Sequence, residues 1–222
     1  MKKRWIVIGL ICALGILGLC LAISAEQVVA RHFRKAGMNT DLLNAIKTRD
    51  TAWAQNLLEH GADIEVKNHE PYDSRNEFED EFTPLALSIV REDVPTIKML
   101  LTHGANVHAT TKSDGNFPAR DIILDNAAKT GNIGIVTLLL NKGAKVDATA
   151  GSGVTPLMMA TSFKHPKMVV LLLQQGADVN AKDDRGFTPL HFVLGTPRRE
   201  SKEAHQNRLE IIHILKKAGA HL

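Results

Sequence analysis

The residues in this chain that could perform chemistry are ten histidines and an acidic loop. Residues 65–81 hold the densest grouping of carboxylates, and a loop is a poor support for positioned acid–base chemistry. His205 and His213 are eight residues apart, with no accompanying carboxylate pattern. The sequence contains no His-Glu-x-x-His, no phosphate-binding glycine loop and no Gly-x-Ser-x-Gly turn. We therefore expect no catalytic residue, no metal site and no cofactor.

The elements that carry these residues are marked by five Gly-Ala doublets, each of which follows an aliphatic cluster. The doublets are Gly61-Ala62, Gly104-Ala105, Gly143-Ala144, Gly176-Ala177 and Gly219-Ala220. Glycine directly after an apolar helical run suits a left-handed helix cap, because glycine has no Cβ to clash at positive φ. The doublets at Gly143 and Gly176 are 33 residues apart, and the other gaps are 43, 39 and 43 residues. Five copies of one unit, separated in part by insertions, are predicted.

Thr-Pro-Leu triplets at Thr83, Thr155 and Thr188 mark the start of three of these units. Threonine caps a helix amino terminus, and proline suits the first helical position because it has no N–H to leave unpaired. The first two triplets precede their glycine by 21 residues, which leaves room for two short helices and a break. Such a pair cannot bury its apolar faces alone, so the copies must stack.

The pattern resembles the ankyrin repeat, and the stretch from Asp183 to His191 (DDRGFTPLH) carries most of it. The resemblance covers residues 38–222 and implies an all-α solenoid of five helix-turn-helix repeats, at about 38–66, 82–109, 121–148, 154–181 and 187–222. It also implies that His191 makes structural hydrogen bonds to neighbouring turns. The third copy departs from the pattern, with Ile122-Ile123-Leu124-Asp125 at the Thr-Pro-Leu-His position.

The amino terminus is predicted to be a targeting or anchoring segment, not part of the repeats. Lys2-Lys3-Arg4 precede an unbroken apolar run of 19 residues, 5–23, which is long enough to span a bilayer. We interpret residues 1–25 as an uncleaved anchor. This hydrophobic helix is expected to lie in the inner membrane of a bacterium and to hold the repeats in the periplasm. The alternative is a signal peptide cleaved near Ala25, which leaves a soluble periplasmic or secreted protein. Residues 26–37 are interpreted as a juxtamembrane or capping helix.

Composition limits the classes of partner. The net charge of +3 comes entirely from the first residues, since the rest of the chain has equal numbers of acidic and basic side chains. A neutral repeat domain argues against nucleic-acid binding, which depends on phosphate electrostatics. Both cysteines, Cys12 and Cys20, lie in the apolar run, so residues 38–222 can form neither a disulfide nor a thiolate metal site.

The resemblance implies that a partner binds the turn tips and the exposed face of the first helix of each repeat. At these positions five residues are apolar where exposure is expected: Phe82, Val90, Val154, Phe163 and Phe187. Arg91 flanks them, and the acidic loop 65–81 adds Tyr72 and Phe78. An apolar stripe bordered by charge is typical of a protein-binding face. The alternatives are that long turns cover part of the stripe and that the acidic loop is only solvated.

We therefore expect a non-catalytic protein–protein interaction module, with an unidentified protein as partner and no small-molecule substrate. A scaffold or inhibitor of an envelope protein is the preferred form. An immunity-type protein that neutralises a toxin is a narrower alternative. An enzyme with a site in the long loops is the alternative from a different class, since function depends on sites and not on folds.

Overall fold

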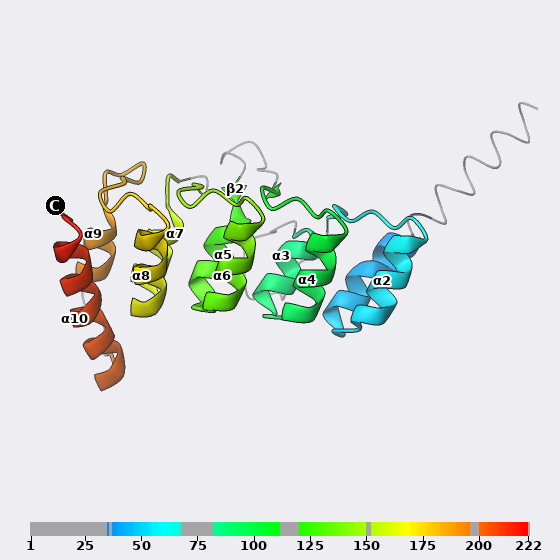
Figure 1. Cartoon of the computed structure of the whole chain (residues 1–222), viewed down its shortest axis with the longest axis horizontal. Helices are drawn as coiled ribbons and strands as arrows, with labels where there is room; N and C mark the ends of the chain where they lie inside the picture. The colour runs from blue at the N-terminus through cyan, green and yellow to red at the C-terminus, as the bar shows by residue number, and fades with distance from the viewer. Residues whose placement is uncertain are drawn as a thin grey trace, which may run out of the picture.

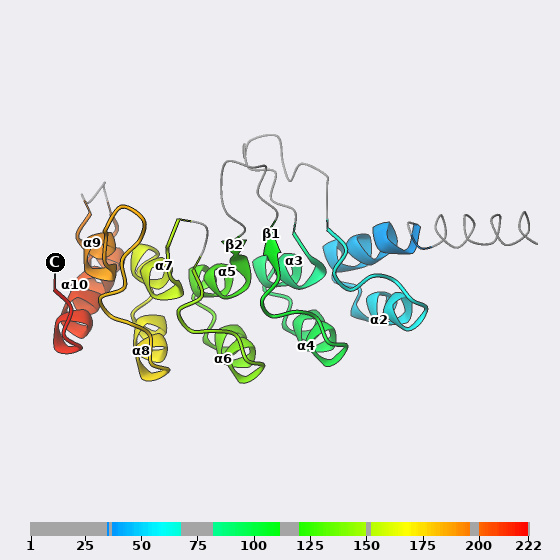
Figure 2. The ribbon, with the colours of Figure 1, turned by 90° about the horizontal axis from the view of Figure 1, so that it is seen from above.

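The computed structural model describes residues 35, 37–67, 82–111, 120–149, 152–195 and 200–221, and these residues form five helix pairs stacked in a row (Figure 1). The first pair consists of helical residues 37–47 and α2 (Thr51–Glu59). The others are α3 (Pro84–Val90) with α4 (Val94–Thr102), α5 (Ile122–Thr130) with α6 (Ile133–Asn141), α7 (Pro156–Ser162) with α8 (Pro166–Gln174), and α9 (Pro189–Leu194) with α10 (Lys202–Lys217). Seen from above, the first helices form one row and the second helices another (Figure 2). The predicted all-α repeat architecture is confirmed for this part of the chain.

The first helices begin where the Thr-Pro triplets predict. Thr83 Oγ1 accepts the Ala86 amide and Thr155 Oγ1 accepts the Met158 amide, both at 3.3 Å. At Thr188 the bond has the opposite direction along the chain: the backbone amide of Thr188 donates to the side chain of His191, at Nδ1, over 3.1 Å. Each of these bonds satisfies a backbone N–H that the helix itself leaves unpaired.

The second helices end at the five glycines, all of which have positive φ between 86° and 98°. The alanine after each glycine donates its amide to the carbonyl five residues back, as Ala177 does to Leu172 at 3.0 Å. This is the Schellman arrangement, and it satisfies a carbonyl that the helix end leaves free. The Gly-Ala doublets are therefore helix stops, as predicted.

A single continuous core runs the length of the stack. It is built from aliphatic side chains of both helix rows, such as Leu42, Ile97, Leu139 and Leu215, each with no exposed surface. Alanines such as Ala86 and Ala160 are equally buried, and a small side chain lets neighbouring helices approach closely. Each pair buries its apolar faces against the next, which is how a repeat protein forms a core.

Three insertions lengthen the unit, in the acidic loop 65–81, around residues 112–120 and at residues 196–205, and part of each is described. Before and after residues 112–119, the strands β1 (Thr110–Thr111) and β2 (Arg120–Asp121) pair antiparallel, with Thr110 opposite Asp121. The last insertion, within the fifth pair, lengthens α10 at its amino end, so that α10 has 16 residues where α2, α4, α6 and α8 have nine. In Figure 1, α10 extends beyond the other helices on the side opposite the turn tips.

The predicted membrane segment lies outside the described residues. Residues 1–25, the apolar run 5–23 and most of residues 26–37 belong to that undescribed part, as do Tyr72 and Phe78 of the acidic loop. Within the described ranges, every helix is too short or too polar to cross a bilayer.

Candidate protein-binding face

The candidate site is a surface formed by the first helices of the fourth and fifth pairs, α7 and α9, and by the turns before them. These helices pack side by side in the first-helix row. We call this surface the C-terminal face, and it consists of Val154, Met159, Phe163, Phe187, Phe192 and Leu194. Phe163 is 44% exposed, and Phe187 and Leu194 are each 42% exposed. The other three are half-buried, and Met159 also packs against the core, so the face has three prominent apolar side chains.

Phe187 is held at the turn tip by the buried carboxylate of Asp183. Asp183 Oδ1 accepts the Phe187 amide at 2.8 Å and the Arg185 amide at 3.0 Å. Burial acts to raise the pKa of Asp183, but the hydrogen bonds from the Phe187 amide and from Arg185 outweigh it and lower the pKa. The turn is therefore fixed by an ionised carboxylate, and the Phe187 ring projects from a rigid base.

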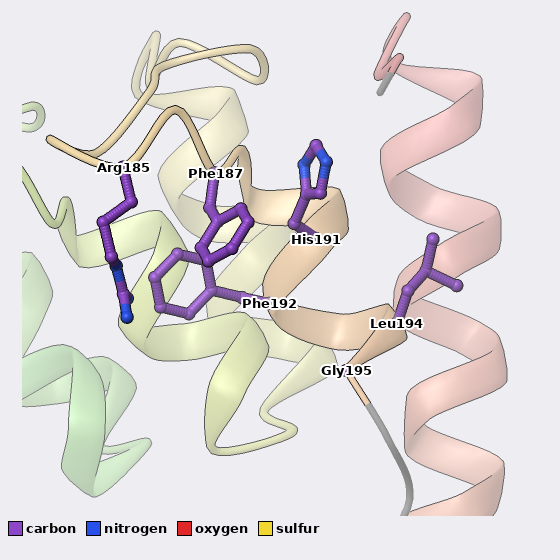
Figure 3. A pocket seen from close by; sticks show the side chains of 6 residues that line it. All are labelled: Arg185, Phe187, His191, Phe192, Leu194 and Gly195. Atoms are coloured by element: carbon purple, nitrogen blue, oxygen red, sulfur yellow. The ribbon is translucent and has the colours of Figure 1, made fainter.

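Beside Phe187 lies an open hollow of about 500 Å³, lined by Arg185, Phe187, His191, Phe192, Leu194 and Gly195 (Figure 3). The Arg185 guanidinium carbon is 5.1 Å from the centre of the Phe187 ring. The His191 ring is 5.4 Å from the same ring on another side. The hollow is thus walled by aromatic and aliphatic groups and has a single cation, Arg185, at its rim.

Phe163 forms the other end of the face. It caps the carboxyl end of α7, and its ring lies under Lys129 of α5, with Nζ 5.2 Å from the ring centre. An ammonium over a ring face is attracted by the ring quadrupole. Both prominent phenylalanines therefore have a cation from a neighbouring segment beside them.

The sequence-predicted residues of the amino-terminal half are placed differently. Phe82 is half-buried and packs against the core, and Val90 is 38% exposed at the end of α3. Arg91 is tied into the stack, because its Nη1 donates to Lys47 O at 2.9 Å and its own carbonyl accepts Arg49 Nη2 at 2.7 Å. Val90 stands apart from the C-terminal face, because α5 lies between α3 and α7.

Sequence reasoning missed four contributors to the site: Met159, Phe192, Leu194 and Arg185. Met159 and Phe192 could have been found, because each lies four residues after the threonine that starts its repeat, one helical turn along the predicted face. No local pattern in the sequence marks Leu194 or Arg185 as part of this surface.

The histidine that lines the hollow, His191, is engaged at the start of its own helix. His191 Nδ1 is occupied by Thr188, whose amide lies at 3.1 Å and hydroxyl at 2.9 Å. These bonds of His191 cap its own helix, whereas the resemblance implies bonds to neighbouring turns. Among the described residues, no group of three or more histidine, cysteine or acidic side chains is placed to hold a metal ion.

Comparison with known proteins gives two results. A family model described as Ankyrin repeats (3 copies) matches residues 42–150 and again residues 124–222. An ankyrin repeat protein of fowlpox virus (strain NVSL) is 28% identical over 125 residues, which is 56% of this chain and 18% of the viral protein. The chain therefore matches less than a fifth of that relative's length. The Thr-Pro starts, the glycine helix stops, the stacked helix pairs and the family match over most of its length together show that this chain belongs to the ankyrin-repeat family.

Proposed function

We propose that this protein is a non-catalytic interaction module whose protein partner docks on the C-terminal face. The observation that carries the proposal is the exposure of Phe163 and Phe187 on two adjacent repeats whose backbone is fixed by buried caps. Exposed aromatic anchors on a rigid scaffold bury large areas at little conformational cost, and such residues dominate the free energy of protein–protein binding. Ankyrin-repeat proteins are generally interaction modules, which supports the same assignment.

The finer form of the proposal concerns place and partner. The basic start and apolar run of residues 1–25 support tethering of the repeats to the inner membrane, with a periplasmic envelope protein held or inhibited by the C-terminal face. Mass measurement of the mature amino terminus tests the tether. A mass that begins at Met1 supports an anchor, whereas loss of about 25 residues supports a cleaved signal peptide.

The face itself is tested by capture of the native partner with the full-length chain. The double variant Phe163→Asp/Phe187→Asp should reduce affinity at least about 30-fold, because hot-spot side chains each contribute about 2 kcal/mol or more. The matched control is Trp53→Asp/Leu209→Asp, which removes two side chains of similar exposure, 39% and 47%, from the second helices α2 and α10. Undiminished binding by the Phe163/Phe187 variant, with its helical content intact, would refute the proposed face.

A further inference from the structure

The hollow on the C-terminal face has the size and lining of a pocket for a bulky apolar side chain. Its volume of about 500 Å³ is within the range of cavities that hold small organic groups. Phe187, Phe192 and Leu194 line it, and Gly195 leaves one side without a side chain (Figure 3). A residue of a partner that enters this hollow would be surrounded by carbon atoms on several sides.

The charge next to the hollow is positive. Arg185 uses Nε and Nη2 to bind Asp183 Oδ2, at 3.3 and 3.1 Å. Its side chain is nonetheless 68% exposed, whereas the carboxylate of Asp183 is almost fully buried at 1%. The remaining N–H groups of the guanidinium can therefore meet a partner, and the carboxylate that balances its charge cannot.

The second cation, Lys129, lies over Phe163 at the other end of the same face. The residues that form the C-terminal face itself include no carboxylate. The turn tip holds one exposed carboxylate, Asp184, against the exposed cations Lys182 and Arg185. Each aromatic anchor is thus paired with a cation. A basic partner would meet an exposed cation beside each anchor, whereas an acidic partner could pair with both.

We propose that the segment recognised by this face is an acidic peptide of a partner protein that carries a bulky aromatic or aliphatic side chain beside its carboxylates. The apolar side chain enters the hollow next to Phe187, and the carboxylates pair with Arg185 and Lys129. The assignment rests on the proposed function, because it names the chemistry of the partner for the same face. Carboxylate-to-guanidinium hydrogen bonds are charge-assisted and stronger than neutral ones, so they give the contact its specificity.

The test is a fluorescence-anisotropy titration of the full-length chain with four labelled synthetic peptides of equal length. One combines glutamate with phenylalanine, one replaces the phenylalanines with serine, one replaces the glutamates with lysine, and one replaces the glutamates with glutamine. The first should bind at least about tenfold more tightly than the other three, and its affinity should fall as the salt concentration rises, because salt screens exposed charges.

Charge reversal provides the decisive comparison. The double variant Lys129→Glu/Arg185→Glu should bind the acidic aromatic peptide at least about tenfold more weakly than the parent chain does. It should bind the basic aromatic peptide more tightly than the acidic one. The control Lys98→Glu/Lys167→Glu changes the net charge equally, at exposed positions on α4 and α8, and should leave the order of the four peptides unchanged.

The outcomes distinguish this inference from the proposed function. In one outcome, Phe163→Asp/Phe187→Asp no longer binds the native partner, the charge-reversed variant still binds it, and the peptides bind without charge preference. The proposed face is then correct, and the inference of an acidic ligand is wrong. If the chain instead self-associates through this face, so that the charge-reversed variant is monomeric in sedimentation, a second copy is the occupant and the inference is also overturned.

Discussion

At the residue scale, one backbone position in the break between the two helices of a repeat has a recurrent conformation. Four repeats have positive φ there, at Arg49, Glu92, Gly131 and Lys164. Three of these residues have side chains, so the conformation alone does not require glycine. Gly131 is different because a Cβ built on it would lie 2.7 Å from Nδ1 of His165, which is in the next repeat. That histidine is fixed in place, since its Nε2 lies 3.0 Å from the carbonyl of Lys129.

The change Gly131→Ala should therefore destabilise the chain by about 1–3 kcal/mol, from unfavourable φ together with displacement of His165. The control is Gly61→Ala, which has φ of 98° and no atom within 4 Å of the added methyl group. Urea denaturation of both variants separates the two causes. Equal losses of stability in the two variants would show that the contact with His165 contributes nothing.

At the element scale, the breaks between helices are joined from repeat to repeat by side chains. Arg91 donates to Lys47 O, Asn132 Nδ2 donates to Glu92 Oε2 at 3.3 Å, and Asn207 Nδ2 donates to Lys164 O at 3.2 Å. Together with the His165 contact, these bonds run along the side of the stack opposite the turn tips. They fix each helix pair relative to the next, and the flat surface formed by the first helices depends on that alignment.

The last helix is held by an ion cluster around Glu200, just before α10. Its carboxylate lies 3.0 Å from Lys164 Nζ, 3.0 Å from His205 Nδ1 and 2.9 Å from Arg208 Nε. Lys164, followed by His205 and Arg208, lowers the pKa of Glu200 to about 2 from its ordinary value of 4.5, although burial acts in the opposite direction. The cluster joins the break in the fourth repeat to the helix of the fifth.

A pH dependence follows, with its sign set by the lowered pKa. The stabilisation from Glu200 is fully present above pH 4.5, the ordinary value, and is lost as the pH falls toward about 2. Glu200→Gln should therefore unfold at lower urea concentration than the parent at pH 7, and the difference should shrink below pH 4.5. Glu210→Gln, an exposed position on the same helix, serves as the control and should follow the parent. A difference that is independent of pH would contradict the ionic role.

At the scale of the whole molecule, the strongest packing among the described helices is between neighbours. α3 packs on α5, α5 on α7 and α7 on α9, while α8 packs on α10 in the second-helix row. A chain organised in this way has a stability that is close to a sum of repeat and interface contributions. Removal of one end of the stack should therefore lower the stability of the adjacent repeat most.

Removal of residues 200–222 should expose the buried side of α8 and α9, including the contacts of Ile211 and Leu215, which are fully buried in the intact chain. We expect amide hydrogen exchange to accelerate at least about tenfold in α7 and α8 and to remain near the parent rate in α2. Uniform acceleration through all the remaining helices would show that the stack unfolds as one cooperative unit.

The sequence alone was enough to predict the repeat architecture, because the information is local. Thr-Pro starts such as Thr155-Pro156 and glycine stops such as Gly176 act within one helical turn, and the structure has a helix beginning or ending at each of these positions. The apolar period of each copy then leaves stacking as the only way to bury both helices. Phe163 and Phe187 could be placed on the exposed side for the same reason, by counting from the threonine.

The tertiary structure decided which of the predicted residues share a surface. Phe82 packs on the core and Arg91 bonds to the neighbouring repeat, whereas Phe163 and Phe187 remain exposed. The cations over the two exposed rings come from other segments, so no local pattern in the sequence could reveal the pairings. The hollow beside Phe187 likewise depends on how α9 and the turn before it are arranged. Helix boundaries are set by interactions between close neighbours in sequence, but a binding surface is set by contacts between repeats, and these exist only once the chain has folded.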